Sequence, residues 1–186
     1  MICGPMFSGK SEEMLRRLRR AEIAGQRVVC FKPRIDDRYD LADVVSHAGA
    51  RMRGVPVASV PELAARAHGF DVVGIDEVQF FAVEIVAAAL ELADAGVRVV
   101  GAGLDQDFRR LPFGPMPDLL AHAEFVDKLQ AVCHRCGGPA TTTQRLVDGE
   151  PAPYSGATIV VGANEQYEAR CRDCHEAGAD FAAVAA

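Results

Sequence analysis

The chain of 186 residues is 49% hydrophobic and 25% charged, an ordinary globular composition with enough apolar material for one medium-sized core and a small appendage. Its net charge of −6 disfavours a nucleic acid partner, because domains that bind DNA or RNA usually carry a basic excess. The sequence has no run of about 20 apolar residues that could span a bilayer, and residues 1–4 lack the features of a secretory signal. We therefore expect a cytoplasmic protein that binds neither nucleic acid nor membrane.

Short β-branched runs alternate with helical patterns over residues 2–130, as in βαβ units around a mostly parallel sheet. In chain order we predict a helix over 14–23, a strand over 27–31, a helix over 59–68, a strand over 71–75, a helix over 80–95, a strand over 97–101, a helix over 117–123 and a strand over 125–132. Cys, Gly, Thr and Pro dominate after Val132, and regular periodicity fades until residues 158–161. The sequence thus predicts an α/β domain over residues 1–131 and a smaller unit over residues 132–186.

A phosphate-binding motif, or P-loop, lies at the N-terminus. Eight residues fit the pattern G-x-x-x-x-G-K-[ST] at each defined position: Gly4, Pro5, Met6, Phe7, Ser8, Gly9, Lys10 and Ser11. The glycines let backbone N–H groups surround a phosphate, and the helix that follows directs its positive end at the same anion. Lys10 would contact the β- and γ-phosphates, and the Ser11 hydroxyl would ligate Mg²⁺.

Two features qualify this motif. A glycine-rich turn that binds nothing is the alternative, but the chain has lysine only at Lys10, Lys32 and Lys128, so a lysine-rich composition does not explain Lys10. Only residues 1–3 precede the loop, whereas the fold needs a central strand there. Either the sequence as given starts late, or that strand is very short.

An acidic pair, Asp76 and Glu77, directly follows the apolar run over residues 71–75. This is the carboxyl end of a strand, where α/β sheets bind their ligands. In P-loop proteins an acid at this place holds Mg²⁺, and a second carboxylate beside it is free to act as a base. A solvated pair at a strand end is the alternative. Together with the P-loop, the pair indicates chemistry on a Mg²⁺–nucleoside triphosphate, without defining the acceptor.

Two C-x₂-C pairs lie in the second unit, and their cysteines are Cys133, Cys136, Cys171 and Cys174. A two-residue turn brings both thiolates of such a pair onto one metal ion, so the four sulfurs predict a zinc site. Redox dithiols or unrelated cysteines are the alternatives. A closed four-sulfur site has no open coordination position, so this zinc would be structural and would tie off residues 138–166. We expect Cys3 and Cys30, which lie in apolar runs, to be core thiols.

Four segments occur in the order GPMFSGKS, IDEVQFF, GLDQDFRRLPFG and GANEQYEARCRDCH. Their combination closely resembles the cellular-type (type II) thymidine kinases, over nearly the whole chain. The resemblance implies a RecA-like P-loop domain with a mostly parallel central sheet, and a small zinc-ribbon domain whose loop, the lasso, covers the nucleoside. It also implies the salvage reaction ATP + thymidine → ADP + dTMP, in a homotetramer that dTTP inhibits.

The same resemblance assigns roles to residues. Glu77 corresponds to the general base for the thymidine 5′-hydroxyl, and Asp76 to the acid associated with Mg²⁺. The nucleotide side of the site also includes Gln79, Asp36 and Arg38. The residues that it places around the nucleoside are Met6, Phe80, Leu104, Phe108, Phe113, Thr143, Val160, Val161, Gly162 and Tyr167. Ala163 stands where the family more often has a glycine, and residues 147–156 are Pro-rich, so this chain departs from the family in its lasso.

Three other functions fit parts of the sequence. The acceptor could be another nucleoside, or the pocket could be broad enough to take deoxyuridine. The chain could also be an ATP-driven module that binds nucleic acid through a zinc ribbon, which its acidic balance disfavours. An inactive nucleotide sensor is the third, and the intact Lys10, Ser11, Asp76 and Glu77 argue against it.

Overall fold

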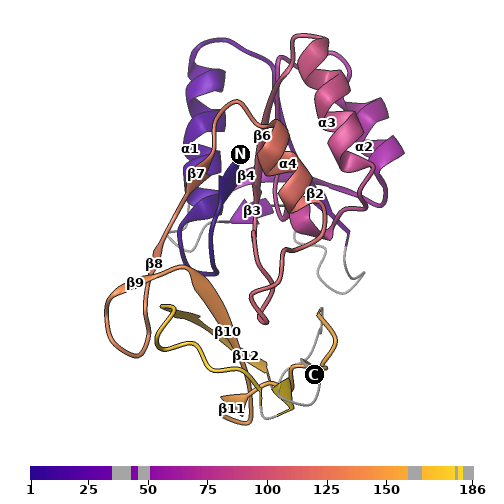
Figure 1. Cartoon of the computed structure of the whole chain (residues 1–186). Coiled ribbons are helices and arrows are strands. Elements are labelled where there is room, and N and C mark those ends of the chain that lie inside the picture. The colour runs from indigo at the N-terminus through magenta and orange to yellow at the C-terminus, as the bar shows by residue number, and fades with distance from the viewer. Residues whose placement is uncertain (35–42, 46–50, 159–164, 179, 182–186) are drawn as a thin grey trace.

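The computed structural model describes residues 1–34, 43–45, 51–158, 165–178 and 180–181. Figure 1 shows a layered α/β part above, and a small β unit made from the C-terminal segment below. Asp36, Arg38, Val160, Val161 and Gly162 lie outside the described residues, so their predicted roles stay predictions. Within the described part of the chain, the helices are too short or too polar to cross a bilayer.

A seven-stranded sheet forms the centre of the α/β part, in the order β3-β4-β2-β5-β6-β1-β7. Its strands are β1 (Ile2–Cys3), β2 (Val28–Pro33), β3 (Asp43–Val45), β4 (Arg51–Val57), β5 (Val72–Ile75), β6 (Arg98–Gly103) and β7 (Asp127–Lys128). Six neighbouring strands, β4, β2, β5, β6, β1 and β7, run parallel to one another, and the edge strand β3 is antiparallel to β4. The predicted α/β fold with a mostly parallel sheet is therefore confirmed. Strand β1 is very short, yet it pairs on both sides.

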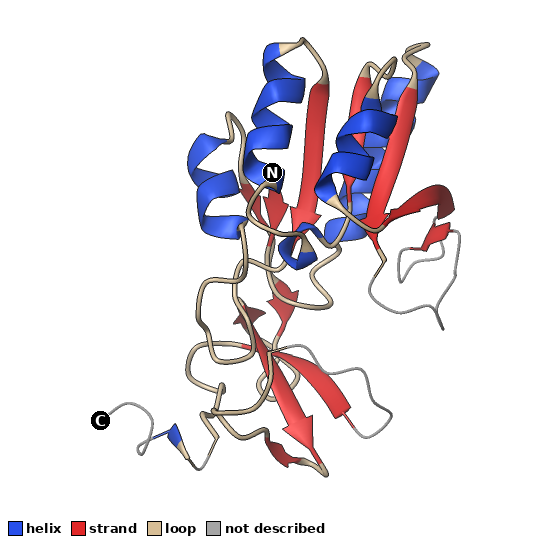
Figure 2. Cartoon of the chain, turned by 90° about the vertical axis from the view of Figure 1, so that its right-hand side faces the viewer, coloured by secondary structure: helices blue, strands red, loops and turns tan. Residues whose placement is uncertain are grey.

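Helices cover both faces of this sheet (Figure 2). They are α1 (Lys10–Ile23), α2 (Val60–Ala67), α3 (Ile85–Asp94) and α4 (Met116–His122). Because side chains alternate along a strand, neighbouring residues enter different cores. Val72 packs in the core under α1, and Val73 in the core under α2, α3 and α4. The carboxyl ends of the strands are left open to ligands at one edge.

The starts of two helices follow from local chemistry. Gly9 precedes α1 with a φ of 82°, a conformation that glycine adopts without steric cost. Ser59 Oγ accepts a hydrogen bond from Glu62 N at 3.3 Å, and the Glu62 carboxylate accepts one from Ala58 N at 2.8 Å. This confirms the predicted start of α2, because the two side chains satisfy backbone donors that the helix leaves free.

The helix predicted over residues 80–95 was wrong in its first part. A short 3₁₀ helix, η1 (Val78–Phe80), follows β5, Phe81 is extended, and α3 begins only at Ile85. The physical reason is the left-handed backbone of Glu77, with a φ of 49°, which turns the chain sharply as it leaves β5. The break keeps residues 77–80 at the edge of the sheet instead of carrying them away in a helix.

The strand predicted over residues 125–132 was also wrong, because it is two strands. Asp127 and Lys128 extend the large sheet beside β1, whereas β8 (Ala131–Val132) pairs with β9 (Pro139–Ala140) in the small unit. Strand β7 is short because β1, its partner in the large sheet, has only two residues. Strands β3 and β4 were not predicted, since β3 is a short edge strand and β4 carries arginines and Pro56, which mask its strand pattern.

The small unit contains β8, β9, β10 (Thr142–Val147), β11 (Glu150–Pro151) and β12 (Glu165–Arg170). Asp148 and Gly149 have φ values of 52° and 86°, and they form the tight turn between β10 and β11. The hydrophobic cluster around its cysteines is built from the small buried residues Ala131, Cys133, Ala140 and Ala169, and among the described residues of the unit Leu146 and Ala152 are buried as well. Burial of these few, mostly small side chains contributes little hydrophobic free energy. The unit therefore needs another source of stability.

Candidate active site

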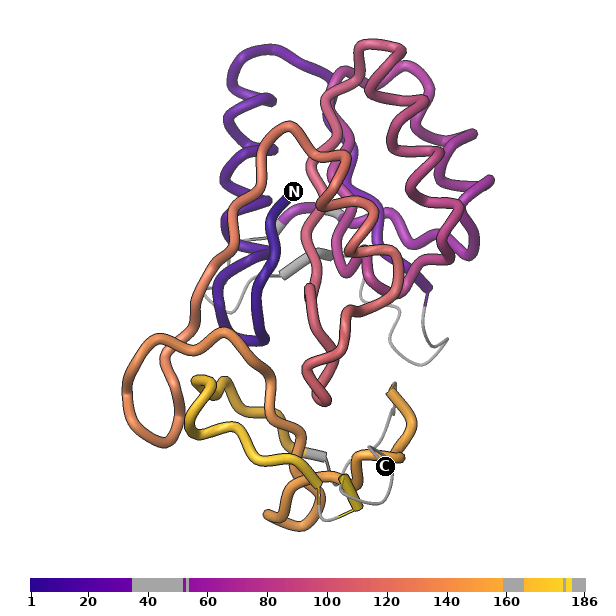
Figure 3. The backbone as a smooth tube through the Cα atoms, viewed as in Figure 1, coloured from indigo at the N-terminus to yellow at the C-terminus, as the bar shows by residue number. Residues whose placement is uncertain are grey.

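The loop over residues 4–11 lies at the carboxyl end of β1 and directly beside the small unit (Figure 3). A Cβ atom at Gly4 would lie 2.4 Å from the Leu129 carbonyl oxygen, so only glycine fits there. Lys10 Nζ and Ser8 Oγ both donate hydrogen bonds to the Pro5 carbonyl oxygen, at 2.7 and 2.8 Å. The loop is thus wrapped compactly around its own lysine, at the N-terminus of α1.

Ser11, in the first turn of α1, meets Asp76, which directly follows β5, although β6 separates β5 from the strand β1 that leads into the loop. Ser11 Oγ lies 3.2 Å from Asp76 Oδ1 and donates a hydrogen bond to it. Asp76 is only 9% exposed. Burial, reinforced by the neighbouring Glu77 carboxylate, raises the pKa of Asp76 to about 6. A hydroxyl and a carboxylate at this separation are the hard oxygen ligands that Mg²⁺ prefers.

Glu77 is adjacent to Asp76 but makes different contacts. Gln79 Nε2 donates a hydrogen bond to Glu77 Oε2 at 2.6 Å, and Gln79 Oε1 accepts one from Leu104 N at 3.1 Å. A Cβ atom at Gly103 would lie 2.5 Å from Gln79 Oε1, and one at Gly114 would lie 2.4 Å from the Gln79 carbonyl oxygen. Gln79 is therefore tightly enclosed, and it fixes the carboxylate of the half-buried Glu77.

The four paired cysteines converge in the small unit. Their Sγ atoms all lie within 4.8 Å of one another, and Cys136 Sγ is 3.7 Å from Cys171 Sγ. Zinc–sulfur bonds of about 2.3 Å place the sulfurs of a tetrahedral site about 3.8 Å apart, so the set fits such an ion. Cys3 and Cys30 are buried in the large part, as predicted for core thiols.

The described residues of the predicted nucleoside pocket form several contacts. The rings of Phe80 and Phe113 meet edge to face, with centroids 5.5 Å apart. Met6 N donates a hydrogen bond to Thr143 Oγ1 at 3.0 Å, which joins the loop to β10. The Leu104 backbone is held by Gln79, as described above.

Two other predicted residues are Phe108, in the segment after β6, and Tyr167, in β12 of the small unit. Phe108 packs under Arg145, whose Cζ lies 5.0 Å above its ring centroid. Tyr167 and Phe7 line a cavity of about 560 Å³ between the loop and β12. Both residues therefore lie where the α/β part meets the small unit.

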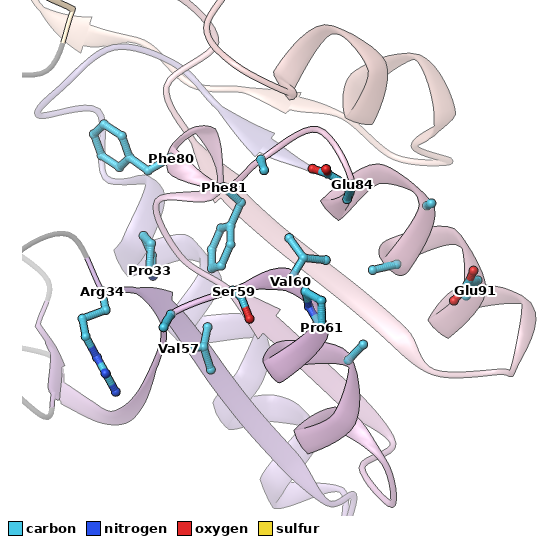
Figure 4. A pocket seen from close by; sticks show the side chains of 15 residues that line it. Pro33, Arg34, Val57, Ser59, Val60, Pro61, Phe80, Phe81, Glu84 and Glu91 are labelled. Atoms are coloured by element: carbon cyan, nitrogen blue, oxygen red, sulfur yellow. The ribbon is translucent and has the colours of Figure 1, made fainter.

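A larger cavity of about 630 Å³ lies between α2 and α3. In Figure 4, Phe81 is turned toward Val60, and Phe80 lies apart from them at the edge of the group. The lining of this cavity is mainly apolar and includes neither the loop over residues 4–11 nor Asp76 and Glu77. We therefore place the reactive centre at the loop and the acidic pair, where titratable groups converge.

Two interactions in the segment after β6 were missed from the sequence. Lys128 Nζ and Asp105 Oδ2 form an ion pair at 2.7 Å beside the loop. Arg109 pairs with Asp107 at 2.7 Å and also donates a hydrogen bond to Thr158 Oγ1 at 2.8 Å. The acids in GLDQDFRR were a signal, but Lys128, which pairs with Asp105, and Thr158, which bonds to Arg109, come from distant parts of the chain.

A glycine-rich loop that opens a helix, facing a hydroxyl–carboxylate pair and a second fixed carboxylate, is an arrangement typical of α/β enzymes that transfer phosphoryl groups. The model of the thymidine kinase family matches residues 1–175, which include the α/β part and all four paired cysteines. The chain belongs to the thymidine kinase family. It is accordingly a kinase, and the predicted family membership is confirmed.

Proposed function

We propose that this enzyme transfers the γ-phosphate of ATP to the 5′-hydroxyl of thymidine and releases dTMP, a step of pyrimidine deoxynucleoside salvage. The observation that carries the proposal is the convergence of Lys10, Ser11, Asp76 and Glu77 at one edge of the sheet. Membership of the thymidine kinase family supports thymidine as the acceptor.

The phosphates of ATP bind to the loop over residues 4–11, where backbone N–H groups and the start of α1 favour an anion. Lys10 offsets negative charge on the β- and γ-phosphates. Ser11 and Asp76 hold Mg²⁺, which neutralises phosphate charge when it is bound. Asp36, Arg38 and Gln79 complete the nucleotide side on the family resemblance. The two side-chain hydrogen bonds of Gln79, to Glu77 and to Leu104 N, favour a role in orienting Glu77.

Glu77 accepts the proton of the 5′-hydroxyl as that oxygen attacks the γ-phosphorus, and the bond from the γ-phosphorus to the β–γ bridging oxygen breaks, so that ADP leaves. Its carboxylate is fixed by Gln79, so it does not need to reorganise during the reaction. Its neighbour Asp76 bonds to Ser11, so the two acids carry separate roles.

The thymine lies among apolar and aromatic side chains, which exclude water and select its shape. The described members of this set are Met6, Phe80, Leu104, Phe108, Phe113 and Tyr167. Thr143 and the lasso residues Val160, Val161 and Gly162 supply hydrogen bonds to the base. On the family resemblance we also propose a structural zinc on the four cysteines, a homotetramer, inhibition by dTTP and a cytoplasmic location.

Replacement Glu77→Gln tests the base directly. We expect ATP binding to persist and kcat to fall by about 10²- to 10⁴-fold, the usual contribution of general base catalysis. Glu84→Gln, which changes an exposed acid before α3, is the matched control and should keep the rate of the unmodified enzyme. A kcat of Glu77→Gln within a few-fold of the unmodified enzyme would disprove the assignment. Competition among thymidine, deoxyuridine and other nucleosides in the same assay defines the acceptor.

A further inference from the structure

An ion pair crosses the end of the strand that carries the phosphate loop. Cys3, the last residue of β1, pairs with Gly103 on one side and with Lys128 on the other. Asp105 follows Gly103 closely, and its Oδ2 lies 2.7 Å from Lys128 Nζ. The pair therefore spans the two neighbours of β1 just where the chain enters Gly4 and the loop.

The two partners differ strongly in exposure. The side chain of Asp105 is 7% exposed, whereas that of Lys128 is 49% exposed. A buried carboxylate is costly unless a cation neutralises it, but an exposed ammonium remains hydrated without a partner. Asp105 thus depends on Lys128 much more than Lys128 depends on Asp105.

Asp105 also acts on the loop itself. Burial lowers the pKa of Lys10, and the carboxylates of Glu77, Asp76 and Asp105 oppose that change. Three acids therefore act on the Lys10 ammonium, and one of them, Asp105, is also paired with Lys128. Without Lys128, one uncompensated negative charge would remain next to the place where a triphosphate binds.

We propose that Lys128 is a nucleotide-affinity residue, which neutralises Asp105 so that the loop can accept an anion. The inference rests on the proposed function, because it assumes that residues 4–11 bind ATP. It assigns Lys128 an electrostatic role through Asp105 and no direct contact with phosphate. Three relations among variants follow from this role.

The test measures the Kd of Mg²⁺–ATP by calorimetry for Lys128→Met, Asp105→Asn and the double variant. We expect Lys128→Met to bind about tenfold more weakly, a change of about 1.4 kcal/mol. Asp105→Asn should bind at least as tightly as the unmodified protein, and the double variant should return to within about threefold of it. Asp127→Asn is the control, because it removes the neighbouring 2.8 Å ion pair between β7 and Arg17. It should leave Kd unchanged.

Unchanged affinity in Lys128→Met would overturn the proposal. So would a double variant at least tenfold weaker than Asp105→Asn, because Lys128 would then contact phosphate directly. That second comparison does not need Lys128→Met to fold, since neither of its proteins retains an uncompensated buried carboxylate. If the unmodified protein itself fails to bind ATP, the proposed function fails. If it binds and phosphorylates thymidine normally, only the role of Lys128 is in question.

Discussion

The α/β part and the small β unit differ in what stabilises them. Two extensive cores of Val, Leu, Ile and Phe side chains sandwich the large sheet, whereas the buried cluster around the cysteines of the small unit contains the small residues Ala131, Cys133, Ala140 and Ala169. Burial of apolar surface can stabilise the first part, whereas we expect the second to gain much of its stability from a metal ion on its four cysteines. The loop and acidic pair thus belong to a scaffold with a large core, and part of the predicted nucleoside pocket belongs to a unit that we expect to depend on an ion.

Loss of the metal should separate the two regions most clearly. Replacement Cys171→Ser removes one of four sulfurs, and we expect it to lower zinc content and unfold the small unit locally. Amide hydrogen exchange should accelerate by more than about 100-fold over β8–β12 and stay slow in β5 and β6. Cys30→Ser, a core thiol outside the metal site, is the control for general thiol loss. Equal acceleration in both parts would contradict this separation.

Asp76 allows a test inside the scaffold. Its carboxyl pKa is about 6 in the folded protein against the ordinary value of 3.8, so the folded state binds the proton more tightly. The ionised form therefore costs stability above about pH 6, and this cost disappears as pH falls toward 4. Without Mg²⁺ at pH 7, Asp76→Asn should raise the free energy of unfolding by up to about 3 kcal/mol.

Urea unfolding of both proteins at pH 7 and pH 4 checks this expectation. The difference in free energy of unfolding between Asp76→Asn and the unmodified protein should vanish at pH 4. At pH 7, saturating Mg²⁺ should reduce this difference, because it binds the Asp76 carboxylate of the unmodified protein. Equal stabilities of the two proteins at pH 7 would show that burial of Asp76 carries no such cost.

Arg109 links the two regions through side chains. It pairs with the buried Asp107 and donates a hydrogen bond to Thr158. Its guanidinium also lies 5.9 Å from the ring centroid of Tyr154. We expect Arg109→Ala to raise KM for thymidine about tenfold, from loss of contacts worth about 1.4 kcal/mol, and to leave KM for ATP nearly unchanged. Steady-state kinetics with Arg98→Ala as an exposed control test this, and an equal rise in both KM values would refute it.

The smallest effect is expected at the single hydrogen bond between Met6 N and Thr143 Oγ1. Thr143→Val keeps the shape of the side chain but removes the acceptor, which should cost about 1 kcal/mol of coupling between loop and β10. Thr141→Val, a half-buried neighbour, serves as its control. We expect the KM for thymidine to rise about fivefold in Thr143→Val and to stay unchanged in Thr141→Val. A variant indistinguishable from the unmodified enzyme would mean that this contact does not couple the two parts.

Local spacing made the main features of this chain predictable. The loop over residues 4–11, the acidic pair after β5 and the two cysteine pairs each depend on residues close in sequence, and the structure brings their described members together as expected. The turn at Glu77 was missed because a left-handed φ at a glutamate has no signal in the sequence pattern. The Asp105–Lys128 pair was missed because it depends on the order of strands, which puts β6 and β7 on either side of β1.

The central claim, phosphate transfer to thymidine by two regions that must both be folded, has one direct test. Radiolabelled phosphate transfer from ATP to thymidine should be measured with the zinc-loaded enzyme, before and after treatment with a strong chelator. We predict labelled dTMP from the loaded enzyme, loss of most of that product after chelation, and recovery when zinc is restored. No label in dTMP from enzyme that holds zinc and binds ATP would contradict the account.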